Sequence, residues 1–545
     1  MPSPATTVDA DLAARVRAWI AGDPDPGDRA ELQALLDVGD GPALADRFAA
    51  PLAFGTAGLR GPLQAGPSGM NRAVVRRAAA ALAAHLGPGR RVVIGHDARH
   101  RSDVFARESA AVMAGAGLHA VLLPRALPTP VLAFAVRALA ADAGVMVTAS
   151  HNPPTDNGYK IYLGGPGDEG AQIVSPTDAE IEARIAAVGP VARIPLDPGF
   201  ETAGEDLVTA YVTAICGLTT GDARDVLVAV TSLHGVGDET LRAAFARAGF
   251  APPVAEPSQA RPDPDFPTVA FPNPEEAGAM DRVLALGARI GADVVLANDP
   301  DADRLAVAVG DRVLTGDEVG RLLADHVLAH RPGPVATTIV SSAMLERIAE
   351  AHGVPVHRTL TGFKWLMRAA GGLVFAYEEA LGYAVGPDVV RDKDGISAAL
   401  LVAELAAAQR AAGRTLLDRL DDLERRHGVH ATAQHVVRVQ RPEQISRIMA
   451  ALRAGPPAAV GPAAVERVED LDRDGGPLPR ADVLVLTLAG ARIVVRPSGT
   501  EPKLKAYLEV VRPPGPDLAA QRAQAGTLLE ALQEALAADL ARRGG

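Results

Sequence analysis

Residues 145–160, with the sequence VMVTASHNPPTDNGYK, indicate both the fold class and a candidate site. A short apolar run, Val145–Val147, leads into the polar pair Ser150 and His151 and then into two prolines. Ligands of open α/β sheets bind beyond the carboxyl ends of strands, where Ser150 would lie. The prolines restrict the backbone and remove two N–H groups, which favours one fixed loop shape. A nucleophile or a phosphate-bearing residue needs such a loop, although an ordinary serine after a strand is the alternative on this stretch alone.

Similar apolar runs recur along the chain and alternate with alanine-rich helical segments. The helices include Arg72–Leu86 and Asp103–Ala116. The predicted strands are Val92–Ile94, Val145–Val147, Val226–Val230, Val294–Ala297, Val335–Val340 and Leu373–Ala376. This alternation predicts mainly parallel sheets flanked by helices.

A weak internal repetition indicates that three domains are related. In three places a helix ends at a glycine, and a short strand and a polar loop follow. Each copy leads to a later strand whose end carries a polar residue: Ser150, Asp299 or Glu378. Repetition of this kind predicts three α/β domains of common design. Any chain rich in alanine and glycine could show such echoes, so the repetition alone leaves both interpretations open.

The length of 545 residues is too great for one core and predicts several domains. From about Arg425 onward, runs typical of strands and a terminal helix, Leu518–Arg543, predict a smaller α+β domain. The predicted fold class is therefore α/β, with three related α/β domains of mainly parallel sheets, a smaller C-terminal α+β domain, and the active site in a central cleft. The predicted domains are residues 1–205, with an N-terminal helical extension, 206–310, 311–425 and 426–545. The proline-rich stretch Ala251–Pro274 is expected to be a surface loop.

Composition narrows the classes of partner and compartment. The formal net charge of −12 argues against nucleic acid but not against a small anionic substrate. Cys216 is the single cysteine, which excludes an intrachain disulfide and favours a reducing compartment. The first residues do not resemble a signal peptide, and apolar stretches such as Ile396–Ala408 contain a charge and are shorter than a membrane span. A cytoplasmic protein without a membrane partner is expected.

The sequence ANDPDADR, residues 297–304, is a candidate metal site. Asp299, Asp301 and Asp303 would converge if the loop curls, and a bound cation would relieve their repulsion. Oxygen ligands suit Mg²⁺ or Ca²⁺ better than Zn²⁺. An EF-hand would need glycine and glutamate where Arg304 and Gly310 stand, so that interpretation fails. The apolar residues before Asp299 argue against the alternative of a solvated acidic turn.

The sequence VVRPSGTEPKLKAY, residues 494–507, is a candidate phosphate cradle. Its glycine lets the backbone approach a ligand, its hydroxyls can donate hydrogen bonds, and an arginine fork matches phosphate oxygens. The spacing of a Walker loop is missing, and an ordinary turn is the alternative. The candidate residues are Arg496, Ser498, Gly499, Thr500 and Lys503.

Three further segments add candidate ligand-binding groups. FGTAGLRG, residues 54–61, contributes Arg60, and TGFKW, residues 361–365, contributes Lys364. YEEALGY, residues 377–383, contributes Glu378 and Glu379, and carboxylates at a strand end can accept hydrogen bonds from sugar hydroxyls.

Taken together, these motifs resemble the α-D-phosphohexomutase family, the phosphoglucomutases and phosphomannomutases, in a branch with phosphopentomutase-like members. The motifs occur in family order over nearly the whole chain. The resemblance implies that Ser150 carries a phosphoryl group and that Asp299, Asp301 and Asp303 bind Mg²⁺, with a phosphoserine oxygen as the fourth ligand. It implies catalytic roles for Lys160, Arg60 and His151. The implied substrate-binding residues are Arg304, Lys364, Glu378, Arg496, Ser498, Gly499, Thr500 and Lys503.

The resemblance also assigns a task to each predicted domain. In chain order these are the phosphoserine loop, the metal-binding loop, sugar recognition and the phosphate clamp. The implied reaction moves phosphate between positions 1 and 6 of a hexose through a sugar bisphosphate, with glucose 1,6-bisphosphate or a matching bisphosphate as activator. The expected partner is a small sugar phosphate, and the expected assembly is a monomer or dimer.

One departure from the family pattern concerns the sugar. Tyr377 and Ala380 stand where the common glucose branch has glycine and serine. Glucose 1-phosphate is the first expectation, with mannose or pentose phosphates as alternatives. A phosphatase using the same serine and metal, and a catalytically silent sugar-phosphate binding protein, are the rival functions. The silent protein is disfavoured because neither the serine nor any of the three aspartates is lost.

Overall fold

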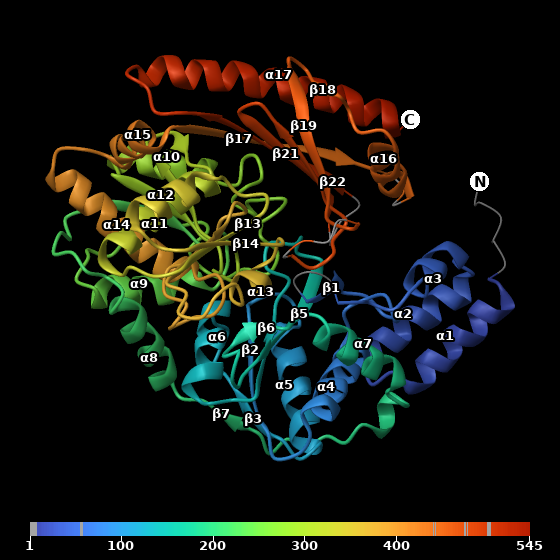
Figure 1. The fold of residues 1–545 in the computed structure, drawn as a ribbon. Helices are drawn as coiled ribbons and strands as arrows, with labels where there is room; N and C mark the ends of the chain where they lie inside the picture. The colour runs from blue at the N-terminus through green and yellow to red at the C-terminus, as the bar shows by residue number, and fades with distance from the viewer. Residues whose placement is uncertain are drawn as a thin grey trace. The chain divides into compact units, whose positions relative to one another are not determined.

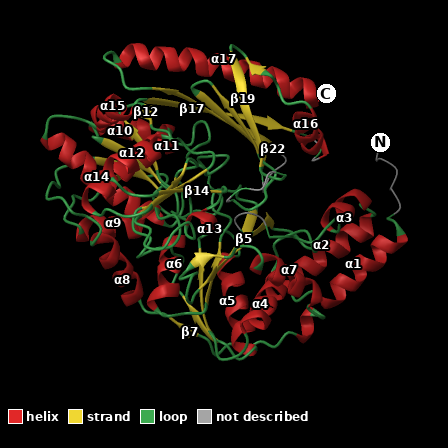
Figure 2. Ribbon diagram, in the orientation of Figure 1, coloured by secondary structure: helices red, strands yellow, loops and turns green. Residues whose placement is uncertain are grey.

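The computed structural model describes residues 8–54, 58–439, 441, 443–473, 476, 478–498 and 503–544 (Figures 1 and 2). The chain divides into two compact units. The first contains Met1–Val313 and Gly382–Glu404, and the second contains Leu314–Leu381 and Leu405–Gly545.

The first sheet of the first unit is mixed, with the strand order β1-β5-β4-β2-β3-β7 and β6 beside β5. Strand β2 pairs in parallel with β3 and β4, and β4 pairs antiparallel with β5. The strands are β1 (Leu59–Pro62), β2 (Arg91–His96), β3 (His119–Leu122), β4 (Ala143–Val147), β5 (Asp156–Leu163), β6 (Ala171–Gln172) and β7 (Glu201–Thr202). The helices are α4 (Arg72–Leu86), α5 (Ser102–Gly115), α6 (Thr129–Ala138) and α7 (Thr177–Ala187).

The second sheet of this unit repeats the arrangement with the order β12-β11-β10-β8-β9. Strand β8 pairs in parallel with β9 and β10, and β10 pairs antiparallel with β11. The strands are β8 (Val228–Thr231), β9 (Val254–Ala255), β10 (Val294–Ala297), β11 (Ala306–Val309) and β12 (Arg312–Val313). The helices are α8 (Glu205–Cys216), α9 (Gly237–Arg247) and α10 (Asp281–Ile290).

The first sheet of the second unit has β13 in parallel between β14 and β15. Its strands are β13 (Val335–Thr338), β14 (Val356–Thr359) and β15 (Phe375–Glu378), and β16 (Gly382–Ala384) follows in the first unit. The helices of the second unit near this sheet are α11 (Gly316–His330), α12 (Met344–His352), α13 (Phe363–Leu366) and α15 (Leu416–His427), and α14 (Gly395–Ala411) begins in the first unit and ends in the second. In all three sheets the first strand of the parallel set lies between the second and the third.

The last sheet has the order β17-β22-β21-β20-β19-β18, and all its pairs are antiparallel. Helices α16 (Glu443–Ala454) and α17 (Leu518–Gly544) pack on it, the latter through the buried Leu532, Leu536 and Leu540. The strands are β17 (Val429–Arg438), β18 (Ala459–Val460), β19 (Ala463–Asp470), β20 (Leu484–Leu488), β21 (Ala491–Pro497) and β22 (Lys503–Arg512). This sheet is the predicted α+β domain.

Three short helices, α1 (Ala10–Gly22), α2 (Pro26–Val38) and α3 (Gly41–Arg47), form the N-terminal extension. Each begins after an aspartate, Asp9, Asp25 or Asp40, whose side chain accepts hydrogen bonds from first-turn amides. A small core of their own, which includes Leu32 and Leu44, holds them together.

The predicted fold class is confirmed: three α/β sheets share one strand order, and a smaller α+β part follows. Antiparallel strands such as β5 and β11 make the first two sheets mixed. Predicted strand ends differ from the observed ones by one or two residues, as for Val226–Val230 against β8, because hydrophobic runs do not mark the last ladder hydrogen bond. Among the described residues no single helix is long and apolar enough to cross a membrane. The bent pair α14 and α15 together has the length and apolar composition of such a span.

Within the second unit, one buried carboxylate joins the last sheet to the loop after β13. Glu509 on β22 accepts hydrogen bonds from Ser342 Oγ (2.8 Å), Ala343 N (2.7 Å), His430 Nδ1 (3.0 Å) and Arg492 Nη2 (3.0 Å). Burial favours the neutral acid, but the bond from His430 and the charge of Arg492 outweigh it and lower the pKa of Glu509 to about 2. The ionised form therefore stabilises this junction.

We expect Glu509→Gln to destabilise the second unit by up to roughly 3 kcal/mol at neutral pH, since one pKa unit corresponds to about 1.4 kcal/mol. Because the folded-state pKa of Glu509 is depressed, this contribution is complete above the unfolded pKa near 4.5 and is lost as pH falls toward about 2. The difference between wild type and variant should thus shrink between these pH values. Denaturation would be followed by the fluorescence of Trp365, which packs beside the junction, in a Trp19→Phe background.

The matched control is Glu469→Gln, which removes a half-exposed glutamate paired with Arg467 on the same sheet. We expect it to change stability by less than about 0.5 kcal/mol at either pH. A Glu509 variant that behaves like this control would contradict the role assigned to the junction.

Candidate active site

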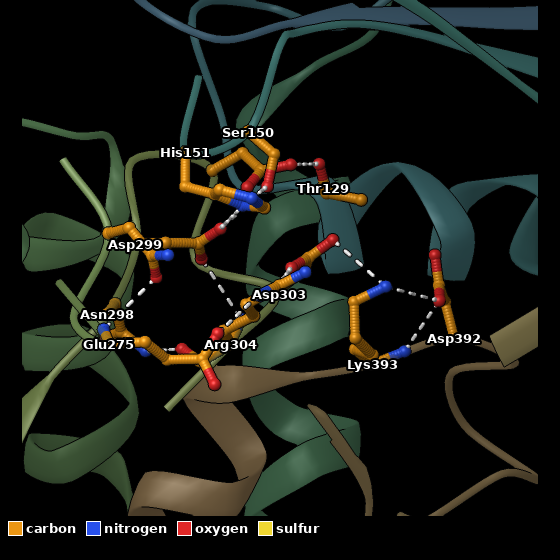
Figure 3. Close-up of polar contacts among 12 residues, drawn as sticks. Thr129, Ser150, His151, Glu275, Asn298, Asp299, Asp303, Arg304, Asp392 and Lys393 are labelled. Atoms are coloured by element: carbon orange, nitrogen blue, oxygen red, sulfur yellow. Dashed lines mark hydrogen bonds and ion pairs between the residues drawn. The ribbon is translucent and has the colours of Figure 1, made fainter. Parts of the chain in front are cut away.

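Ser150 lies in the turn that follows β4 and is buried. Its φ of 53° is unusual for a residue with a side chain, and its N–H donates to Thr148 Oγ1 at 2.8 Å. The hydroxyl donates to Asp299 Oδ2 at 2.8 Å and lies 3.2 Å from His151 Nδ1, so the three side chains meet (Figure 3). The strained turn thus presents the hydroxyl to the aspartate loop.

The aspartate loop follows β10 in the equivalent position of the second sheet. Asp299, Asp301 and Asp303 are buried, and one carboxylate oxygen from each lies within 4.8 Å of the other two. The Arg304 N–H donates to Asp299 Oδ1 (3.1 Å), and Asn298 Nδ2 donates to the Arg304 carbonyl (2.7 Å). These bonds curl the loop and bring the alternate carboxylates together.

Two lysines and a threonine approach the carboxylates. Lys160 on β5 donates to Asp301 Oδ2 (2.7 Å) and Asp303 Oδ2 (2.9 Å), and Lys393 Nζ lies 3.4 Å from Asp303 Oδ2. Thr129, at the start of α6, donates its hydroxyl to Asp301 Oδ2 at 2.6 Å. The positive charges offset part of the repulsion among the three aspartates.

The surroundings shift the pKa values of the three carboxyl groups in different directions. Burial, together with the charges of Asp301 and Asp303, raises the pKa of Asp299 well above its usual value. Burial also favours neutral Asp303, but the charges of Lys160 and Lys393 outweigh it and lower its pKa. The same ion pairs outweigh burial at Lys160 and raise its pKa, so it stays a cation.

The cluster fits a divalent cation. Within the described part of the chain, Asp301 Oδ1 and Asp303 Oδ1 are buried atoms without a hydrogen-bond partner. Buried polar atoms are normally satisfied, and a cation would satisfy both. An all-oxygen set of this kind suits Mg²⁺, for which the sequence also argued.

The remaining candidates of the first unit lie around the serine loop. Arg60 on β1 donates to Asn152 Oδ1 at 3.3 Å, and burial lowers its pKa. Arg304 Nη1 lies 3.4 Å from Glu275 Oε2. Burial and the nearby charges of Arg304 and Arg60 hold the pKa of His151 well below its usual value, so its ring is neutral. The structure thus brings together Arg60, Ser150, His151, Lys160, Asp299, Asp301, Asp303 and Arg304.

The segment Arg391–Gly395, with the sequence RDKDG, was not expected at the site. Asp392 accepts hydrogen bonds from Tyr162 Oη (2.8 Å) and Gln172 Nε2 (3.0 Å), which fixes the segment beside β5 and β6. A Cβ at Gly395 would lie 2.3 Å from the Arg304 carbonyl, so only glycine allows this approach to the aspartate loop. A charged pair next to a glycine before the apolar α14 is the signal that the sequence offered.

The other candidates belong to the second unit. Glu378 ends β15, Lys364 lies in α13, and Arg496 on β21 pairs in register with Lys505. The Ser498 N–H donates to the Lys503 carbonyl at 2.8 Å, which joins the residue after β21 to the first residue of β22. Gly499 and Thr500 lie outside the described residues.

Glu379, the neighbour of Glu378, directly follows β15 and has a shifted pKa. Burial, with the charges of Glu378 and Asp317, raises its pKa to about 7. The hydroxyls of Ser341 and Thr338 donate to its Oε2 at 3.1 and 3.3 Å. Its position at the end of β15 corresponds to those of Ser150 and Asp299 in the first two sheets.

Comparison with known proteins agrees with this arrangement. Four models for the domains of phosphoglucomutase/phosphomannomutase match in order: α/β/α domain I at residues 51–190, domain II at 209–312, domain III at 315–426 and the C-terminal domain at 436–523. A crystal structure of a Thermus thermophilus protein assigned to the phosphomannomutases has a TM-score of 0.68 and 27% identity, covering 88% of this chain and 99% of that one.

Two curated relatives cover most of the chain. A Haemophilus influenzae protein named a probable phosphomannomutase is 44% identical over 81% of this chain and 93% of its own length. A Mus musculus phosphopentomutase is 34% identical over 93% of this chain and 92% of its own. With four domain models matched in order and relatives of this identity and coverage, the chain belongs to the phosphoglucomutase/phosphomannomutase family and is an isomerase of the phosphotransferase type, a mutase.

Proposed function

We propose that this protein is a phospho-sugar mutase that carries the transferred phosphoryl group on Ser150. The observation that carries the proposal is the 2.8 Å hydrogen bond from the Ser150 hydroxyl to Asp299, within a cluster of three buried carboxylates that fits a divalent cation. A hydroxyl held at such a cluster can bear a phosphate whose charge the bound cation would neutralise. We keep 1–205, 206–310, 311–425 and 426–545 as the proposed domains.

In the proposed reaction, the bond between phosphorus and Ser150 Oγ breaks as a bond forms to a free hydroxyl of the sugar phosphate. The proton that the sugar hydroxyl loses ends on Ser150 Oγ, and the neutral ring of His151, whose Nδ1 is 3.2 Å from that oxygen, can relay it. Lys160 and Arg60 supply fixed positive charge beside the serine loop. Return of the other phosphate to Ser150 completes the isomerisation.

A divalent cation, Mg²⁺ in our proposal, would be held by Asp299, Asp301 and Asp303 and would neutralise charge on the transferring phosphoryl group. The sugar bisphosphate formed midway would serve as activator when added from outside. Glucose 1,6-bisphosphate is the compound that we propose for this role.

The second unit would bind the parts of the substrate other than the reacting phosphate. Glu378 would accept hydrogen bonds from sugar hydroxyls, and Lys364 would approach the same ligand. The phosphate that does not react would be gripped by Arg496, Ser498, Gly499, Thr500 and Lys503. The hydrogen bond from Ser498 N–H to the Lys503 carbonyl supports this role, because it holds the end of β21 beside the start of β22.

The names of the relatives support mannose and pentose phosphates as substrates more than glucose phosphate. Glucose 1-phosphate was the first expectation from the sequence. One relative is named a probable phosphomannomutase and another a phosphopentomutase. Tyr377, which replaces the glycine of the glucose branch, is buried and donates to Asp317 Oδ1 at 3.0 Å. We therefore propose mannose 1-phosphate and ribose 1-phosphate ahead of glucose 1-phosphate.

We expect Ser150→Ala to reduce mutase turnover to background, because no other residue carries the phosphoryl group in the proposed reaction. Intact mass spectrometry should show one phosphate on the wild type after treatment with glucose 1,6-bisphosphate and none on the variant. Ser109→Ala, which removes a buried hydroxyl bonded within α5, is the matched control and should keep its activity. More than a few per cent of wild-type turnover in Ser150→Ala would exclude this carrier.

We expect Asp301→Asn to weaken Mn²⁺ binding, measured by titration calorimetry as a stand-in for Mg²⁺, by at least about tenfold, since even outer-shell changes have effects of this size. The control Asp206→Asn alters an exposed carboxylate in the first turn of α8 and should bind normally. Turnover should stop in excess EDTA and return with Mg²⁺. Unchanged Mn²⁺ affinity in Asp301→Asn would contradict the metal site.

We expect mannose 1-phosphate or ribose 1-phosphate to give a higher kcat/KM than glucose 1-phosphate in a panel assay with catalytic sugar bisphosphate. Free phosphate is measured in the same assay. Glucose as the best substrate would contradict the ranking alone, whereas phosphate release without isomerisation would favour a phosphatase. A protein that binds these sugars without turning them over would favour the silent binding protein.

A further inference from the structure

The guanidinium of Arg99 is hydrogen-bonded to the backbone of the serine loop. Arg99 lies in the turn between β2 and α5 and is only 4% exposed. Its Nη2 donates to the carbonyls of Ser150 (2.7 Å) and Asn152 (2.5 Å), and its Nη1 donates to those of Pro153 (2.7 Å) and Asp156 (3.1 Å). One side chain therefore satisfies four carbonyls of the loop.

The loop makes few backbone hydrogen bonds of its own, such as Asn152 N to the Ala149 carbonyl (3.1 Å), so an external clamp adds restraint. Pro153 and Pro154 have no N–H to donate, and Ser150 is held at a positive φ that side chains rarely adopt. Strained backbone persists only where the surroundings enforce it. The planar fork of arginine offers several donors in fixed directions, which the single ammonium of lysine does not.

The orientation of Arg99 is fixed from its own turn. Asp97 Oδ1 accepts hydrogen bonds from the Arg99 N–H (3.0 Å) and from Ser102 Oγ (2.6 Å). The other carboxylate oxygen of Asp97 lies 3.4 Å from Arg99 Nε. The carboxylate thus sets the guanidinium in place for the four carbonyls.

One face of the guanidinium is covered by Phe266, from the segment between β9 and α10 of the second sheet. The ring of Phe266 lies over Arg99, with 4.9 Å from the guanidinium carbon to the ring centre, and Phe266 is 2% exposed. Phe266 belongs to the stretch Ala251–Pro274, which the sequence indicated was a surface loop. An aromatic ring over a desolvated guanidinium attracts it and keeps water from its N–H groups.

We propose that Arg99 and Phe266 form a positioning pair that fixes the Ser150 loop for phosphoryl transfer, so that the proline-rich loop acts on the reactivity of the serine. This inference rests on the proposed function, with Ser150 as carrier. Neither residue touches the reacting atoms. Their effect is on where the Ser150 hydroxyl stands relative to Asp299.

The chain contains a matched pair away from the site. Arg224 lies over the ring of Phe250 at 4.7 Å and donates to the carbonyls of Ala248 (2.7 Å), Gly221 (2.6 Å) and Ala223 (2.9 Å). This pair has the same chemistry as Arg99 and Phe266 and holds loops that carry no candidate residue. Its variants therefore report what loss of such a pair does to stability alone.

The experiment compares Arg99→Lys and Phe266→Leu with the controls Arg224→Lys and Phe250→Leu in the full chain. Each protein is first stripped of phosphate, and transfer from glucose 1,6-bisphosphate to Ser150 is timed by rapid quench and intact mass. We expect Arg99→Lys to slow transfer roughly 10- to 100-fold and Phe266→Leu roughly 3- to 10-fold, as for lost charged hydrogen bonds and a lost cation–π contact. Mn²⁺ affinity and KM for the sugar phosphate should stay within about twofold of wild type, because the ligand sites are untouched.

The melting temperatures separate positioning from stability. Variants of both pairs should lower Tm, those of the more buried Arg99 by more, but only the Arg99 and Phe266 variants should slow phosphoryl transfer. Transfer by Arg99→Lys at a rate within about twofold of Arg224→Lys would overturn the inference. If Arg99→Lys does not fold, Phe266→Leu against Phe250→Leu decides by the same criterion. A wild-type enzyme that takes no phosphate on Ser150 would refute the proposed function itself, which is a distinct result.

Discussion

Three buried carboxylates in the first unit repel one another, and the arrangement of the segments around them depends on offsetting this repulsion. Charges within 4.8 Å of each other repel by roughly 3–4 kcal/mol per pair at an effective dielectric constant of about 20. Lys160 and Lys393 offset part of this, and Thr129 donates to one carboxylate. They come from β5, from the turn before α14 and from the start of α6. Segments distant in sequence are thereby fixed around one point, where two carboxylate oxygens are still available to a cation.

The repeated sheet arrangement explains why a polar group stands at the same place in each of the three α/β sheets. In each of the three α/β sheets the third strand of the parallel set lies beside the first strand of that set. A polar residue ends this third strand or closely follows it: Ser150, Asp299 or Glu378. The carboxyl ends of parallel strands meet at one edge of a sheet, which is where α/β proteins bind ligands. One design thus supplies a hydroxyl, a metal-binding loop and a pair of acids. In this chain, copies of one sheet arrangement therefore differ in the polar residues that follow the same strand.

The serine loop shows how local strain is balanced by contacts from other parts of the fold. Ser150 has a positive φ and is followed by prolines, so the loop is stiff but poor in hydrogen-bond donors. Arg99 supplies those donors, and Phe266 covers the guanidinium that does so. In the second unit, Glu509 similarly joins the last sheet to the loop after β13. In both cases one buried charged group with several partners links a loop to another part of its unit.

The sequence by itself determined what depends on near neighbours in the chain. Alternating apolar runs predicted the sheets, and the polar residues after two of those runs predicted Ser150 and the three aspartates, because a strand and the loop behind it are continuous in sequence. Only the tertiary structure decided which groups surround them. Ser150 and Asp299 are 149 residues apart, and Lys160 and Asp301 are 141 apart, so no spacing rule links them. Arg99, Lys393 and Phe266 were not identified because a lone arginine, lysine or phenylalanine in a loop looks the same whether it faces water or a buried partner. Burial and long-range pairing assign their roles, and both exist only once the chain has folded.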